Sequence, residues 1–137
     1  MARVLTVVLG VVVVLAAVPA LAHHPAFVLG TVTITQPVLA GGKTLQPGTY
    51  EVRDTGEHVK PLPGQSEDAQ TYVEFVANGA LVARDVAELM TGQPLAVGTS
   101  GGAATRLRFE RLRGDDFTRI STYRGSERYL IHLPVAR

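Results

Sequence analysis

Two histidines, His23 and His24, follow a segment with the three-part layout of a secretory signal peptide. Arg3 precedes an apolar run over residues 4–18, and the small-residue sequence Ala20-Leu21-Ala22 then provides a cleavage site. Cleavage after Ala22 would make His23 the first residue of the mature chain. Its free amine and its imidazole would then lie on one residue, and such a pair of nitrogen donors suits Cu(II).

A copper site at the new N-terminus would need a further nitrogen ligand from the folded part of the chain. The two remaining histidines are His58 and His132. We predict a metal site formed by His23, His24 and His132, with His58 as the alternative to His132. The arrangement resembles the N-terminal copper sites of exported copper carriers and polysaccharide monooxygenases. The competing interpretation is that both N-terminal histidines are exposed and bind no ligand.

Catalytic residues are not evident in the sequence. The chain has no cysteine, which excludes a thiol nucleophile and a cysteine-based zinc or iron–sulfur site. No nucleophile and base have the spacing of a catalytic pair, and the sequence assigns no acid–base partner to His58 or His132. We therefore expect a protein without enzymatic activity, and no cofactor unless copper binds. The alternative is a small hydrolase or isomerase in which His132 acts as the base.

Arginine is concentrated near the C-terminus, interleaved with the acidic residues Glu110, Asp115, Asp116 and Glu127. The arginines are Arg106, Arg108, Arg111, Arg113, Arg119, Arg124 and Arg128. If the strands that carry them are neighbours, opposite charges can pair across a polar face. The functional alternative is a patch that binds an anionic ligand or a lipid head group, because arginine binds phosphate and carboxylate groups through two hydrogen bonds at once.

The balanced overall charge argues against binding to nucleic acid through phosphate contacts. The chain has 13 basic and 12 acidic side chains, and loss of Arg3 with the leader would leave 12 of each, with no basic block. The leader is too short to span a bilayer, which takes about 20 apolar residues, so we expect no membrane span after cleavage. These features predict a periplasmic or secreted protein that binds an unknown protein or envelope ligand.

Glycine and proline divide the rest of the chain into short runs that are typical of β-strands. The chain contains 14 glycines and 8 prolines, and the runs between them are rich in β-branched residues. We predict strands over residues 27–36, 43–45, 49–53, 71–77, 80–90, 105–112, 117–123 and 128–135. Residues 80–90 also show helical spacing, but the preceding Asn78-Gly79 sequence favours a hairpin and hence a strand.

The remaining segments are predicted turns and loops. Residues 54–56 are expected to form a turn before a short returning strand at residues 58–59, and residues 61–68 and 93–104 are expected to form loops. No helix is required to connect the strands. The sequence therefore predicts a signal peptide over residues 1–22 and a single all-β domain over residues 23–137, folded as a small antiparallel β-barrel or β-sandwich of seven or eight strands.

A local motif carries a resemblance to known proteins. Residues 42–52 read GKTLQPGTYEV and match the pattern GKxLxxGxYxV. The glycines allow tight turns, and Leu45 and Tyr50 are expected to point inward from the two sides of a closed β-corner. The pattern resembles a hairpin of small exported bacterial β-domain proteins of unassigned function. The resemblance implies the fold and export, and it implies no activity.

Overall fold

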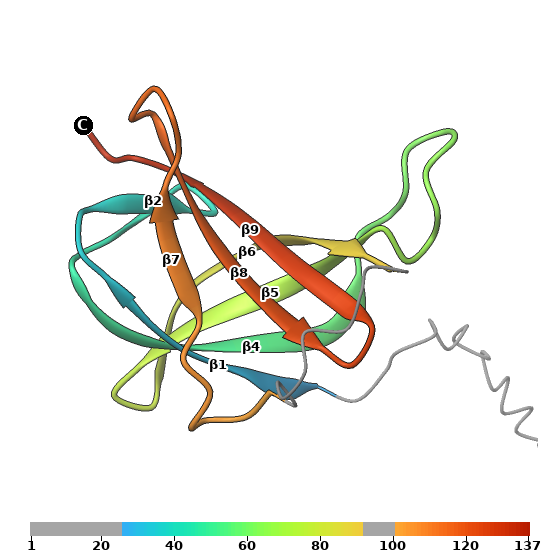
Figure 1. The fold of residues 1–137 in the computed structure, drawn as a ribbon, viewed down its shortest axis with the longest axis horizontal. Helices are drawn as coiled ribbons and strands as arrows, with labels where there is room; N and C mark the ends of the chain where they lie inside the picture. The colour runs from blue at the N-terminus through green and yellow to red at the C-terminus, as the bar shows by residue number, and fades with distance from the viewer. Residues whose placement is uncertain (1–25, 92–100) are drawn as a thin grey trace, which may run out of the picture.

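The computed structural model describes residues 26–91 and 101–137 and contains nine strands and no helix in these ranges (Figure 1). The strands are β1 (Phe27–Ile34), β2 (Val38–Ala40), β3 (Lys43–Leu45), β4 (Gly48–His58), β5 (Gln70–Ala77), β6 (Ala80–Met90), β7 (Arg108–Arg111), β8 (Phe117–Arg124) and β9 (Glu127–Pro134). The predicted all-β fold is confirmed. In the described residues, no helix has the length and apolar character needed to cross a membrane.

Seven strands form one antiparallel sheet that curls until its two edges meet. The order across the sheet is β1-β4-β5-β6-β9-β8-β7, so β1 and β7 are the edges. The backbone N–H of Thr31 donates to the carbonyl of Thr105 (2.7 Å), and the N–H of Leu107 donates to the carbonyl of Thr31 (2.9 Å). These two bonds bring the sheet close to a closed barrel, so of the two predicted architectures the barrel is the one observed.

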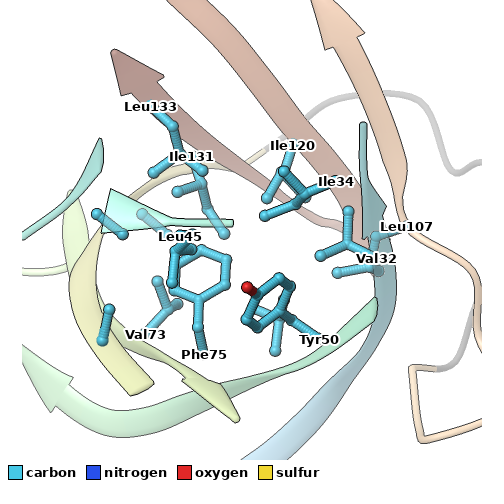
Figure 2. Close-up of a cluster of buried hydrophobic side chains, with 14 of the residues drawn as sticks. Val32, Ile34, Leu45, Tyr50, Val73, Phe75, Leu107, Ile120, Ile131 and Leu133 are labelled. Atoms are coloured by element: carbon cyan, nitrogen blue, oxygen red, sulfur yellow. The ribbon is translucent and has the colours of Figure 1, made fainter. Parts of the chain in front are cut away.

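The barrel interior is filled by side chains that alternate along each strand with outward-facing ones. Buried residues from every strand except β7, and from the segment before β7, meet there (Figure 2). They include Val32, Ile34, Tyr50, Val52, Val73, Phe75, Leu107, Ile120, Ile131 and Leu133. Each fully buried aliphatic or aromatic side chain contributes roughly 1.5–3 kcal/mol of hydrophobic stabilisation. The core therefore occupies the space in which larger barrels hold ligands.

The hairpin formed by β2 and β3 packs against one end of the barrel. Gly41 lies in its turn with φ +55°, and a Cβ atom there would lie 2.0 Å from the carbonyl oxygen of Arg84 on β6. The N–H of Gly41 also donates to Oδ2 of Asp85 (3.1 Å). Leu45 and Tyr50 are buried, as the hairpin pattern predicts, and the Tyr50 hydroxyl donates to the carbonyl of Gln46 (2.7 Å).

The predicted turn at residues 54–56 is wrong, because β4 continues through it to His58. The N–H of Gly56 donates to Oδ1 of Asp54 (2.8 Å), and Gly56 has φ +76°. The pairing with β5 shifts register between Asp54 and His58. Gly56 therefore lies at a register shift within a long strand, and the chain does not reverse there.

The other predicted strands agree with the structure to within a few residues. Residues 80–90 form β6, and Asn78 (φ 51°) and Gly79 (φ 77°) form the tight turn of its hairpin with β5. β7 is shorter than predicted, because residues 105–107 bond to β1 and not to β8. Residues 93–100 of the predicted loop lie outside the described residues, as does the predicted signal peptide.

Candidate functional site

The outer face of β7, β8 and β9 brings the C-terminal arginines together. Leu107, Ile120 and Ile131 point into the barrel, so their neighbours along each strand point outward. The pairing places these outward side chains in rows across the three strands. The rows are formed by the pairs Arg108 with Ser121, Glu110 with Arg119, Arg119 with His132, and Tyr123 with Arg128.

A pocket of about 250 Å³ lies on this face. Its lining contains four arginines, one acidic residue and three neutral residues. The lining residues are Arg106, Arg108, Arg119, Arg128, Glu110, Ser121, Thr122 and Tyr123. Four guanidinium groups against one carboxylate leave a net positive charge, so the pocket attracts anions.

Glu110 pairs with two of the four arginines. Its Oε2 accepts a hydrogen bond from Nη2 of Arg119 at 2.9 Å, and its Oε1 lies 3.1 Å from Nε of Arg108. The hydrogen bond from Arg119, together with the charges of Arg108 and Arg128, lowers the pKa of Glu110 against the opposing effect of burial. Glu110 therefore remains ionised at neutral pH and pairs with Arg108 and Arg119.

Arg106 and Arg128 form no salt bridge with the described residues. The guanidinium of Arg128 lies over the ring of Tyr123, 5.5 Å from its centroid. The Nε atoms of Arg119 and Arg128 are buried and have no hydrogen-bond partner. A buried donor without an acceptor is costly. The four guanidinium groups give the pocket the positive charge that an oxyanion site requires.

The sequence allows two interpretations of the arginines: ion pairs between neighbouring strands, or a patch that binds an anionic ligand. Each describes part of this face. Glu110 forms the cross-strand ion pair with Arg119 that the first alternative expects. Arg106 and Arg128 converge on a pocket without such a partner, as the second alternative expects. The sequence could not choose between them, because the rows depend on which strands pair and in which register.

The predicted metal ligands are only partly within the described residues. His23 and His24 lie outside them. His132 is half-buried on the outer face of β9, opposite Arg119, and His58 lies at the end of β4, with Nδ1 3.3 Å from the carbonyl of Gln70 and Nε2 3.9 Å from Asp68. The described residues contain no group of three or more His, Asp or Glu side chains that could hold a metal ion. Copper binding by His23, His24 and His132 stays a prediction.

A second polar cluster lies inside the barrel, around Asp54, for which the sequence pattern predicts only a turn. Asp54 is fully buried. Its Oδ1 accepts hydrogen bonds from the Thr71 hydroxyl and the Gly56 N–H, both at 2.8 Å, and its Oδ2 accepts one from the Tyr129 hydroxyl at 3.0 Å. Because both oxygens have partners, the cluster is a satisfied structural network.

No protein-family model, curated protein or solved structure matches the chain. Function therefore rests on the chemistry of the arginine pocket. A guanidinium group can donate two parallel hydrogen bonds to a carboxylate or a phosphate group, so this lining is chemically suited to an oxyanion.

Proposed function

We propose that this protein is an exported, non-catalytic binding module of the periplasm, the envelope or the exterior, and that its ligand carries a carboxylate or phosphate group. The observation that carries the proposal is the pocket formed by Arg106, Arg108, Arg119 and Arg128. Its lining carries four guanidinium groups against the single carboxylate of Glu110, which gives it a net positive charge. Export is supported by the leader-like residues 1–22 and by the resemblance of the hairpin to exported β-domains.

A binding role is favoured over catalysis by the residues of the pocket. Arginine stays protonated and cannot act as a general base. Glu110 is held in its ionised form by Arg119 and Arg108, so it is a poor proton donor near neutral pH. The remaining lining side chains are two alcohols and Tyr123. This set of groups can bind and orient an anion, and it offers no activated nucleophile.

The test is a calorimetric titration of the purified protein with inorganic phosphate and, separately, with galacturonate. The two probes distinguish a phosphate ligand from a carboxylate ligand. Arg128→Ala removes a guanidinium that forms no salt bridge with the described residues, and we expect it to weaken binding of the preferred probe about tenfold. The matched control is Arg113→Ala, since Arg113 is exposed and does not line the pocket.

Unchanged affinity in Arg113→Ala together with the loss in Arg128→Ala would support the proposal. Equal losses in the two variants would indicate attraction by net charge alone and would contradict it. The absence of binding by either probe to the wild-type protein would also contradict it. Cell fractionation and sequencing of the mature N-terminus test export, and a protein that keeps its leader and stays in the cytoplasm would overturn that part.

A further inference from the structure

The two edges of the sheet leave an open groove where they separate. Within the described residues, β1 is bridged at Thr31 to Arg106, in the segment just before β7. Beyond this bridge lies a groove of about 590 Å³. One wall is lined by Thr31 and Thr33 of β1, by Thr35 just after β1, and by Thr49 of β4. Leu107 and Phe109 line the other wall. Figure 2 shows Val32 and Leu107 on the same side of the barrel, where the two edges meet.

The wall formed by β1 presents backbone hydrogen-bonding groups to this groove. Thr31 uses its N–H and its C=O to bond residues 105 and 107, so it makes no ladder bonds to its β4 partner. Bonding direction alternates along a strand in an antiparallel pair. Thr33, two residues further on, therefore also directs its N–H and C=O toward the groove.

The wall formed by β7 presents the same kind of edge. The N–H of Leu107 donates toward β1, whereas the N–H of Leu112 donates to the carbonyl of Phe117 at the start of β8. By the same alternation, Phe109 directs its backbone groups toward the groove. Thr33 and Phe109 thus stand on opposite walls, and none of the backbone hydrogen bonds among residues 26–91 and 101–137 outside the strand ladders involves their donors and acceptors. Such edges are templates for an added strand.

We propose that the groove binds the extended C-terminal tail of a partner protein, which adds a strand between β1 and β7 and places its terminal carboxylate at Arg106. β1 and β7 run in the same direction, away from the end of the groove that residues 101–107 close. A strand antiparallel to both, the more stable pairing, must run toward that closed end. Its C-terminus therefore arrives beside Arg106.

The closed end has the features that a terminal carboxylate requires. Arg106 is exposed there and forms no salt bridge with the described residues. Ala103 and Ala104 line the same end with small side chains, and the Thr31 hydroxyl donates to the carbonyl of Ala103 (3.0 Å), which holds this segment against β1. A guanidinium and a carboxylate form a strong charge-assisted pair.

The groove suits a polypeptide better than a glycan. Its walls offer backbone groups at the spacing of a β-strand, and its apolar residues, Leu107 and Phe109, pack on the core. Side chains of an added strand would alternate between this apolar floor and solvent.

The test uses fluorescence anisotropy with a fluorescein-labelled hexapeptide of alternating threonine and valine, prepared as the C-terminal acid and as the C-terminal amide. We expect the acid to bind about tenfold more tightly than the amide, because only the acid pairs with Arg106. Arg106→Ala should remove this difference. Arg128→Ala should keep it, since Arg128 lines the arginine pocket and not the groove.

Thr33→Pro tests the pairing of the backbone. Proline removes the N–H that faces the groove and leaves the bonds to β4 intact, as edge strands allow. We expect binding of both peptides to fall about tenfold, while Thr33→Ala, which keeps the N–H, stays within about threefold of wild type. Phosphate binding at the arginine pocket should be unchanged in both variants. A loss of peptide binding in the groove can therefore be distinguished from a loss of anion binding in the pocket.

Three results would overturn the proposal: equal binding of acid and amide, unchanged binding in Thr33→Pro, or binding of a galacturonate hexamer at the groove in place of the peptide. If Thr33→Pro does not fold, amide hydrogen exchange in the wild-type protein replaces it. Exchange of the Thr33 and Phe109 amides should then slow when the acid peptide binds. Unchanged exchange at both amides would contradict strand addition.

Discussion

The Tyr129 hydroxyl donates a 3.0 Å hydrogen bond to Oδ2 of Asp54 inside the barrel, between residues 75 positions apart in the sequence. The bond joins β9 to β4, which are not neighbours in the sheet. Thr71 and the N–H of Gly56 satisfy the other carboxylate oxygen. A buried carboxylate is tolerated only with such partners, so this cluster ties distant strands together.

Replacement of Tyr129 by phenylalanine should destabilise the protein. Tyr129→Phe leaves Oδ2 of buried Asp54 without this donor, and we expect the free energy of unfolding to fall by about 2–3 kcal/mol. Urea denaturation at pH 7 measures the change. The control is Tyr72→Phe, because the Tyr72 hydroxyl forms no hydrogen bond with the described residues. Equal effects of the two substitutions would contradict the role of the Asp54 bond.

The same tyrosine should make stability sensitive to alkaline pH. Burial, and then the negative charge of Asp54, raise the pKa of Tyr129 above its ordinary value near 10. The unfolded chain therefore loses this proton at lower pH than the folded protein does. The stabilisation that protonated Tyr129 gives the folded state is fully present below about pH 10 and is lost as the pH rises further. Denaturation midpoints from pH 8 to 11.5 should fall more steeply for wild type than for Tyr129→Phe, and parallel curves would contradict this.

Closure of the barrel should depend on Gly30. A Cβ atom at this position would lie 2.4 Å from the carbonyl oxygen of Thr105 and 2.7 Å from Cδ2 of Leu107. Gly30→Ala must therefore push the segment before β7 away from β1, and we expect a loss of about 2–4 kcal/mol in the free energy of unfolding. Gly48→Ala on the paired strand is the control, since its nearest neighbouring atom is 3.8 Å away. A similar loss in both variants would argue against a specific contact at the seam.

Removal of the charge of Glu110 should strengthen anion binding. Glu110 competes with a bound anion for Arg119 and Arg108, so Glu110→Gln is expected to increase affinity for the preferred probe about fivefold. Because the pairs are partly exposed, the cost in the free energy of unfolding should be below about 1 kcal/mol. Calorimetry and urea denaturation measure the two quantities. Weaker anion binding in a folded Glu110→Gln protein would show that Glu110 is needed to position the arginines.

The copper hypothesis makes a prediction that is independent of the pocket. Mature protein that begins at His23 should bind one Cu(II) ion with nitrogen ligands, and one extra residue before His23 should abolish tight binding by displacing the free amine from the imidazole. Calorimetry and electron paramagnetic resonance follow the titration. His132→Ala tests the third ligand. Weak or non-stoichiometric binding of Cu(II) to the mature protein would contradict this hypothesis.

Local sequence determined most of the strands of this protein. Asn78-Gly79 specifies its hairpin because both residues tolerate positive φ, and the β-branched run before it forms a strand whose buried and exposed faces follow an alternation of period two. The same short-range information predicts the hairpins between β7, β8 and β9. These features can be predicted from the sequence because they depend on residues that are neighbours in the chain.

Only the tertiary structure decided where the polar groups meet. Asp54 suggested a turn, yet its position inside the barrel follows from the register of β4 with β5 and from a tyrosine on β9. Arg106 and Arg128 converge because β7, β8 and β9 pair side by side, and the groove at Thr33 exists because the sheet curls without completing its last seam. Strand order and closure arise from packing of the whole core, which no local pattern encodes.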